Sequence, residues 1–216
     1  MDSKRWAHKP KIIHVKRLNV VLRWVQRNPR KLCYHPFDLP GKHFRIISDA
    51  AFKKEDEKGH SLRGTLYVSA PGTAVDHFHR NGPIHILEYL SKAQRHVTRS
   101  TFSSELHACC DAADLGVLLL LILHEIDAGP VTSAQHRVLR ENGGYCIPMV
   151  LQIDAMSVFA AITAAYVKAP AEKSLLSHVQ FVRNYLTPRC LLHYIGLTLA
   201  TCSRTVLLKE VLIAMP

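Results

Sequence analysis

Apolar residues recur with two different periods in the first half of the chain. Between positions 18 and 25 four aliphatic residues recur at helical spacing, which predicts an amphipathic helix over about residues 14–27. Asn28-Pro29 ends it, because the residue before a proline is pushed out of the helical region. Three shorter apolar runs follow, at about 43–49, 63–69 and 84–90, and predict strands. Their short connections favour an antiparallel meander.

Helical periodicity returns in the second half of the chain. Thr101 or Ser103 is the expected N-cap of a long helix that ends near Ile126, before Gly129-Pro130. Met149 to Ile153 has almost no polar alternation, which is typical of a central strand covered on both faces. The other predicted elements are helices at about 132–141, 156–167 and 173–186, and a strand from Leu191 to Ile195. The pattern therefore predicts an α/β fold with a five-stranded mixed sheet flanked by helices.

The charge of the chain points to a polyanionic partner. The net charge is +11 and the pI is about 9.6, and residues 1–33 carry ten Lys or Arg and a single acid. A surplus of this size favours nucleic acid over a membrane. The alternative is an ordinary solvated basic surface. A hydrophobic share of 48% leaves enough apolar residues for a core.

Cysteine usage and the apolar runs indicate an intracellular protein without membrane contact. The six cysteines include no CxxC pair, so we expect reduced thiols and neither a disulfide framework nor a zinc site. The N-terminus lacks the apolar segment of a signal peptide. Leu115 to Leu123 is very apolar but far shorter than the roughly 20 residues that span a bilayer, so we expect a buried helix there.

Three acidic residues stand in informative settings. Asp49 and Asp154 each end a short apolar run, and Glu105 lies in the expected first turn of the long helix. Singly, each has a simpler explanation, because Asp often forms turns and a first-turn Glu complements the helix dipole. Together, the order strand-Asp, helix-Glu, strand-Asp is what a two-metal nuclease needs, with carboxylates from different elements converging on a pair of ions roughly 3.5–4 Å apart.

These residues resemble the ribonuclease H domain of copia-type LTR retrotransposon polyproteins. That domain opens with a strand ending in Ser-Asp-Ala, which here is Ser48 to Ala50. A Ser-x-x-Gln segment and a Ser/Thr-rich cap then lead into a Glu-bearing helix, matched here within Tyr89 to Leu106. The basic helix from Val15 to Arg27 resembles the connection from the reverse transcriptase. The likeness covers about residues 15–196 and is most specific from Ser91 to Ala108.

The resemblance implies a fold, a reaction and a partner. The fold is ribonuclease H-like, and the reaction is hydrolysis of the RNA strand of RNA–DNA hybrids during reverse transcription. Asp49, Glu105 and Asp154 are the implied catalytic residues and metal ligands, for two Mg²⁺ or Mn²⁺ ions that activate water. The implied partners are the hybrid, held by backbone and 2′-OH contacts, and the reverse transcriptase part of the same polyprotein. Cytoplasmic particles or the nucleus would be the location.

Several other polar residues bear on this site. Four residues just before the long helix are candidates for nucleic-acid binding: Lys92, Gln94, Arg95 and Arg99. The alternative is that they form a solvated basic loop. His77 and His79 lack neighbouring ligands and are not expected to bind metal, and His178 is expected on a groove or the surface. Asp111 and Asp114 lie two to three turns beyond Glu105 on other helix faces and are excluded.

The chain departs from the family at its C-terminus. The family carries a fourth Asp in a late segment of the type Asp-Thr-Arg-Asp-Met-x-Ala-Asp-Gly-Leu-Thr-Lys-Gly, but this chain has no acid between Glu172 and Glu210. Codons read from their third base can spell that segment across the tail, with the missing Asp encoded across Arg204 and Thr205. We therefore infer a frameshift near Ile195 or Gly196. The alternative is an ordinary apolar C-terminal segment.

The sequence thus predicts three parts and leaves rival functions. The parts are a basic connection segment at 1–40, a ribonuclease H-like domain at 41–196 and an out-of-frame tail at 197–216. One rival is a catalytically dead retroelement remnant that only binds nucleic acid. A second is a transposase or integrase on the same fold, which carries its Glu last. Here Glu105 comes between the two Asp residues, which argues against that class.

Overall fold

The computed structural model describes residues 11–29, 32–37, 41–52, 60–72, 83–166, 170, 172–186 and 190–194. The chain consists of two compact units, and Phe37 is the first residue of the larger one. The expected tail at 197–216 lies outside the described residues.

The smaller unit contains the amphipathic helix α1 (Ile12–Arg27), which confirms the helix predicted at about 14–27. Asn28 caps its C-terminus, and its backbone N–H donates to the carbonyls of Trp24 and Val25. No residue of α1 is buried.

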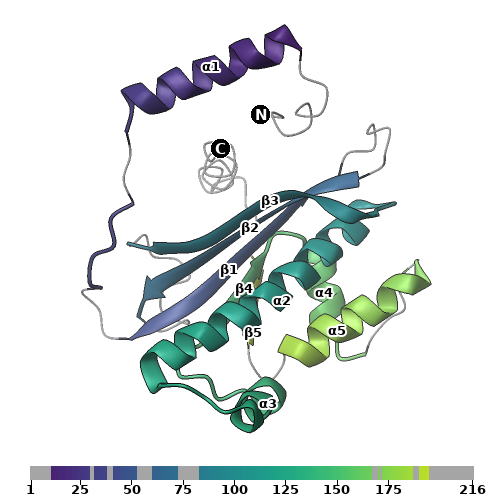
Figure 1. The fold of residues 1–216 in the computed structure, drawn as a ribbon. Coiled ribbons are helices and arrows are strands. Elements are labelled where there is room, and N and C mark those ends of the chain that lie inside the picture. Colours follow the sequence, from purple (N-terminus) through teal and green to yellow (C-terminus); the bar gives the residue numbers. More distant parts are fainter. Residues whose placement is uncertain are drawn as a thin grey trace. The chain divides into compact units, whose positions relative to one another are not determined.

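The larger unit is built on a five-stranded mixed sheet (Figure 1). Its strands are β1 (Lys42–Ala51), β2 (His60–Pro71), β3 (His85–Val97), β4 (Met149–Ile153) and β5 (Cys190–Tyr194). The order across the sheet is β3-β2-β1-β4-β5. β1 to β3 form an antiparallel meander, and β4 and β5 add in parallel beside β1. This is the ribonuclease H-like topology, and the predicted fold class is confirmed.

The helices of the larger unit follow the meander and the later strands. They are α2 (Thr101–Ala128), α3 (Ser133–Asn142), α4 (Met156–Thr163), the 3₁₀ turn η2 (Lys173–Leu175) and α5 (Leu176–Leu186). α2, α4 and α5 lie on the same side of the sheet (Figure 1). Their inward faces and the facing strands share one apolar cluster, which includes Phe44, Leu106, Leu151, Val158 and Val179.

Several predicted element boundaries were wrong, three of them in β3 and in the helices after β4. β3 runs to Val97 and does not end near residue 90, α4 ends at Thr163 and not near 167, and the segment from 173 begins with a 3₁₀ turn. β3 is an edge strand, with most residues from Ser91 to Val97 exposed. An edge strand of this kind does not need the apolar alternation that would reveal it in the sequence.

Close packing between α2 and β1 anchors the helix layer. Gly116 of α2 lies where a Cβ would overlap Ile46 Cδ1, so the missing side chain lets the helix approach the sheet. Tyr67 of β2 donates from its hydroxyl to the Ala112 carbonyl at 3.2 Å. These contacts hold α2 against β1 and β2.

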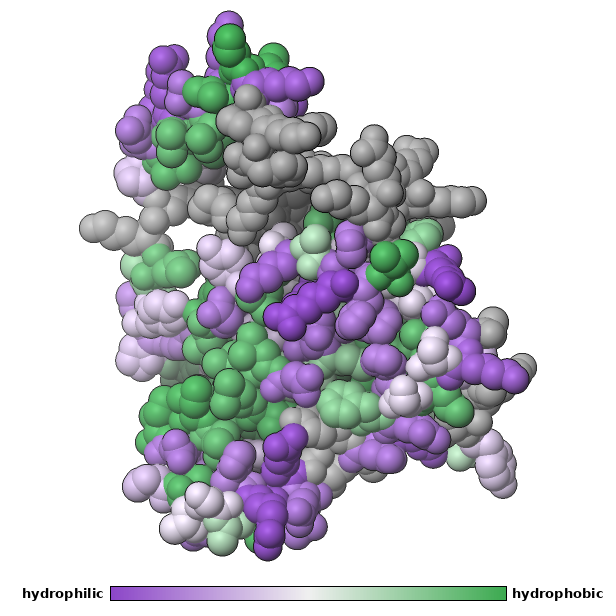
Figure 2. Space-filling view, turned by 45° about the vertical axis from the view of Figure 1, so that its right-hand side comes forward, coloured by the Kyte–Doolittle hydropathy of each residue, from purple (hydrophilic) through white to green (hydrophobic). Residues whose placement is uncertain are grey.

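The C-terminal half of α2 has an exposed apolar stripe. Leu118, Ile122 and Ile126 recur every fourth residue and are 55%, 45% and 72% exposed. Figure 2 shows a broad hydrophobic area low on the left of its view, on the side where this end of α2 lies in Figure 1. α2 has the length and composition of a membrane-crossing helix, but half of its apolar window is buried inside the protein. The prediction of a buried helix from Leu115 to Leu123 thus holds for one face only, where Gly116, Val117 and Leu120 are buried.

Candidate metal centre

The three acidic residues singled out in the sequence converge in the structure. Asp49, Glu105 and Asp154 each offer one carboxylate oxygen, and these oxygens all lie within 4.8 Å of one another. Among the described residues, this set alone brings three potential ligands together at such distances. The predicted convergence is confirmed, and the catalytic role of the three residues stays a prediction.

Asp49 is held inside a strand and does not end one. β1 continues to Ala51, and Asp49 pairs across the antiparallel register with Gly64 of β2. The prediction that the strand ends at Asp49 was therefore wrong. A turn-forming role is excluded by the same observation. Because Gly64 has no side chain, the position opposite Asp49 is not crowded by a neighbour on β2.

Asp154 enters from the neighbouring parallel strand. It follows directly after Ile153, the last residue of β4, and precedes α4 at Met156. Ile153 pairs in register with Ser48, the residue before Asp49. The register of two parallel strands thus brings the two aspartates to the same end of the sheet.

Glu105 is supplied by the N-terminal part of α2. Ser100 caps this helix, its hydroxyl accepting from Ser103 N at 3.1 Å, so the expected cap at Thr101 or Ser103 was wrong. With Thr101 as the first helical residue, Glu105 is the fifth and lies past the first turn. The simpler explanation, that Glu105 only complements the helix dipole, is weaker at this position, because the effect of the dipole falls off beyond the first turn.

The electrostatics of the centre favour a bound cation. Glu105 is 8% exposed, and burial together with the charges of Asp154 and Asp49 raises its pKa to about 8. The backbone N–H of Ala50 donates to its carboxyl and opposes that rise. Three carboxylates this close repel one another when ionised, so a divalent cation would stabilise the charged forms. Hard oxygen donors are the set that Mg²⁺ or Mn²⁺ takes.

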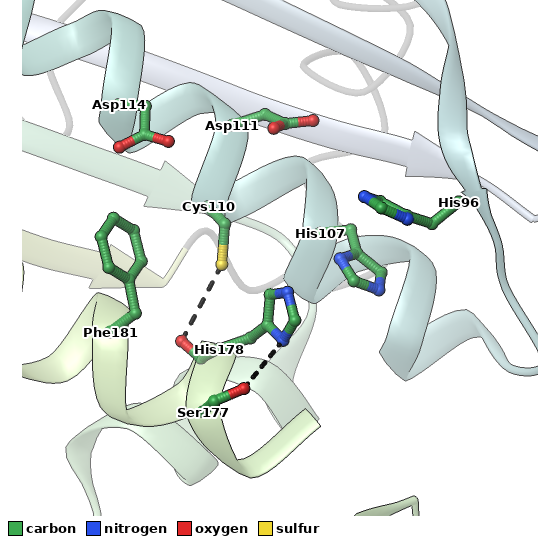
Figure 3. A pocket seen from close by; sticks show the side chains of 8 residues that line it. All are labelled: His96, His107, Cys110, Asp111, Asp114, Ser177, His178 and Phe181. Carbon is green, nitrogen blue, oxygen red and sulfur yellow. Dashed lines mark hydrogen bonds between the residues drawn. The ribbon is translucent and has the colours of Figure 1, made fainter. Parts of the chain in front are cut away.

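The two excluded acids on α2 serve elsewhere. Asp111 forms an ion pair with Arg63 of β2. Asp114 lines a pocket away from the three carboxylates (Figure 3), and partial desolvation of its carboxyl raises its pKa. Neither belongs to the acidic centre.

The four candidate nucleic-acid residues divide between surface and interior. Lys92 and Arg95 are exposed on β3, and Arg99 is exposed in the turn before α2. They were expected in a loop, and the longer β3 instead fixes the first two on a strand. Gln94 is 3% exposed, and its side-chain amide donates to the Ser104 carbonyl. In this position Gln94 supports α2 and is not available to a nucleic acid.

The histidines fall into two groups. His77 and His79 lie outside the described residues. His178 of α5 lies beside His107 of α2, which in turn lies beside His96 of β3. Burial, together with His178 and His96, lowers the pKa of His107. Sequence reasoning placed His178 on a groove or surface and missed this cluster, because the three positions are distant along the chain and carry no common motif.

The sequence matches no protein-family model and no curated protein. Several solved structures are partly similar to it in backbone fold. LC11-RNase H1, solved in complex with RNA/DNA hybrid, has a TM-score of 0.41 at 12% identity over 71% of this chain and 85% of its own. RNase H1 from the halophilic archaeon Halobacterium salinarum gives 0.42 at 14% identity, over 80% of this chain and 99% of its own.

A viral protein is also similar. The protease-reverse transcriptase of prototype foamy virus gives a TM-score of 0.41 at 12% identity, over 83% of this chain and 22% of its own. Similarity of this extent leaves the function to be inferred from the residues of the site itself.

Proposed function

We propose that this chain derives from a metal-dependent endonuclease that hydrolyses the RNA strand of RNA–DNA hybrids. The observation that carries the proposal is the convergence of Asp49, Glu105 and Asp154, whose carboxylate oxygens lie within 4.8 Å of one another on a ribonuclease H-like sheet. The positive net charge supports a nucleic-acid substrate.

The residues of the chain supply the ligands and the charge for this chemistry. Asp49 is supplied by β1, Glu105 by α2 and Asp154 by the residue that follows β4. Two divalent ions, when bound, supply a water nucleophile and stabilise the leaving 3′ oxygen. Glu105 has to lose its proton to serve as a ligand, and the neighbouring aspartates oppose that loss until a cation balances them.

The lineage and the state of the site are part of the same proposal. The copia-like stretch from Tyr89 to Leu106 supports a retrotransposon origin, next to a reverse transcriptase. The lack of any acid between Glu172 and Glu210 supports an impaired site, because the family's fourth Asp would help hold the second ion. Mg²⁺ keeps several waters and tolerates little geometric error, so losing one ligand is costly.

A second candidate function follows from the missing fourth Asp. A catalytically dead remnant would keep the basic surface and bind nucleic acid without cleaving it. The missing fourth acid favours this alternative, and hybrid binding without cleavage would be its signature.

A cleavage assay with labelled RNA and DNA strands separates these functions. The chain as written should cleave the RNA strand weakly or not at all. Replacing the tail from Gly196 onward by the in-frame family motif should restore Mg²⁺-dependent cleavage of the RNA strand only. The same restored chain carrying Asp154→Asn is the control and should be inactive.

Two results would count against the proposal. A restored chain that is folded by circular dichroism and still fails to cleave any hybrid would remove the nuclease assignment. Robust cleavage by the chain as written would show that three acids suffice and that the tail is no impairment.

A further inference from the structure

The helix α1 combines exposed apolar side chains with positive charge. None of its 16 residues is buried, and it carries four Lys or Arg and no acid. Eight of its large apolar side chains, Trp24 among them, are 46–77% exposed. From this combination we propose that α1 is a membrane-binding helix, which lies in the surface of an anionic phospholipid bilayer.

An apolar face runs along the whole helix. Val15, Leu18, Leu22 and Val25 follow one another at spacings of three and four residues, which places them on one side. At 3.6 residues per turn these four positions share an arc of about 80°. Each of them is 46–50% exposed. This face is therefore a continuous apolar stripe in contact with solvent.

A basic strip lies on the opposite side of the same helix. Lys16, Arg23 and Arg27 are spaced by seven and four residues and fall within an arc of about 40°. Asn19 and Gln26 lie beside them, so this polar side carries no negative charge. A helix with one apolar face and a Lys/Arg-rich polar face is typical of segments that lie in the plane of a membrane interface.

The exposed apolar face favours a bilayer over nucleic acid for this helix. The phosphates of a nucleic acid would neutralise the basic strip but leave the aliphatic side chains in water. An anionic bilayer contacts both sides, because the apolar face enters the acyl boundary and the long Lys and Arg side chains reach the headgroups. The net charge of the chain alone favours nucleic acid, and the exposed apolar face changes that preference for α1.

The length of α1 suits a helix that lies on the bilayer and does not cross it. Its 16 residues span about 24 Å, which is less than the hydrocarbon thickness of about 30 Å. None of the three acidic-centre residues, Asp49, Glu105 and Asp154, belongs to α1. Membrane binding by α1 therefore stands or falls separately from the nuclease function.

Vesicle binding by the full chain tests the proposal. The chain has two tryptophans, so Trp6→Phe leaves Trp24 as the single fluorescent reporter. With mixed phosphatidylcholine–phosphatidylserine vesicles, the chain should float with the lipid, and the emission of Trp24 should shift to shorter wavelength. Pure phosphatidylcholine vesicles should bind at least about tenfold more weakly, because each Lys or Arg near an anionic surface contributes about fivefold in affinity.

Two variants separate the apolar face from the basic strip. Leu18→Gln with Leu22→Gln keeps every charge and a good helix former at both positions, and should weaken vesicle binding by about tenfold or more. Lys16→Gln with Arg23→Gln should weaken it by about fivefold for each charge. If the leucine pair binds vesicles like the parent while the charge pair binds them less, α1 is a general polyanion-binding surface, as for nucleic acid, and the proposal is overturned.

The exposed apolar stripe of α2 supplies a matched control. Leu118→Gln with Ile122→Gln removes two exposed aliphatic side chains from the larger unit and should leave vesicle binding unchanged. Asp154→Asn should also leave it unchanged, which keeps the test independent of the acidic centre. Circular dichroism checks that each variant is folded. No binding of the folded chain to phosphatidylserine vesicles, equal binding to pure phosphatidylcholine, or loss of binding in the α2 variant overturns the proposal.

Discussion

The side-chain amide of Gln94 donates a 2.7 Å hydrogen bond to the backbone carbonyl of Ser104, the residue before Glu105. Both residues are buried, at 3% and 0% exposure. The bond ties the edge strand β3 to the start of α2, and so fixes the turn of helix that presents Glu105 to the two aspartates. Gln94, which was expected to contact nucleic acid, thus helps to position Glu105 of the acidic cluster.

Gln94→Ala should destabilise the chain and loosen the centre. It removes a buried hydrogen bond and leaves the Ser104 carbonyl without this partner, which costs about 1–3 kcal/mol in the free energy of unfolding. Urea denaturation measures this cost, and Gln180→Ala, at an exposed site on α5, should stay within about 0.5 kcal/mol of the parent. Equal stability of the two variants would show that the Gln94 bond does not hold α2 in place.

Without divalent ions, the free energy of unfolding should fall as pH rises. The pKa of Glu105 is about 8 in the folded chain and about 4.3 when unfolded. Between these values the folded state keeps a proton that the unfolded state has released, so stability is highest below the lower value and is lost towards the upper one. Glu105→Gln cannot ionise and should flatten this slope in denaturation experiments with EDTA. The same slope in parent and variant would refute a protonated, buried Glu105.

Gly116→Ala should destabilise the packing of α2 on β1. The new Cβ would overlap Ile46 Cδ1, in a side chain with 0% exposure, and overpacking costs about 1–3 kcal/mol. The gain in helix propensity offsets about 1 kcal/mol of that cost. Ile46→Val removes Cδ1, so the double variant should be more stable than the sum of the two single changes predicts. Strict additivity in thermal denaturation would contradict this account of the close approach.

Hybrid binding should depend on the three exposed basic residues before α2. Replacing Lys92, Arg95 and Arg99 by Ala should weaken binding and flatten its dependence on salt, by about one unit of slope for each phosphate that no longer has a cationic partner. A control that removes three charges elsewhere, at Arg137, Arg140 and Lys173, should keep more of the slope. If the two triple variants have the same slope, the first three are ordinary surface charges.

The sequence anticipates elements that carry a strong pattern of their own. β4 was predicted as Met149 to Ile153 and has those bounds, because all five residues are buried and the run is apolar almost throughout. The convergence of Asp49, Glu105 and Asp154 was also predicted, because the two aspartates follow apolar runs of neighbouring parallel strands and the resemblance supplied the helix.

Features that depend on tertiary contacts could not be predicted from the sequence. The far half of β3 is exposed at the sheet edge, so its polar residues from Ser91 to Val97 give no period to recognise. In the sequence, Gln94 is one polar residue in a basic stretch. Its role is visible only in the fold, where it bonds to Ser104 of α2. The neighbouring rings of His96, His107 and His178 were not predicted for the same reason. Only the packing of α5 against α2 brings the ring of His178 next to that of His107.

Direct measurement of Mn²⁺ binding tests the central claim, that Asp49, Glu105 and Asp154 form a divalent cation site. The electron paramagnetic resonance signal of free Mn²⁺ should fall when the full chain is added and recover when Mg²⁺ competes. Asp49→Asn and Asp154→Asn should each abolish this loss of signal, while Asp127→Asn, at an exposed acid near the end of α2, should keep it. Mn²⁺ binding that persists in both site variants, or no binding by the folded parent chain, would contradict the account.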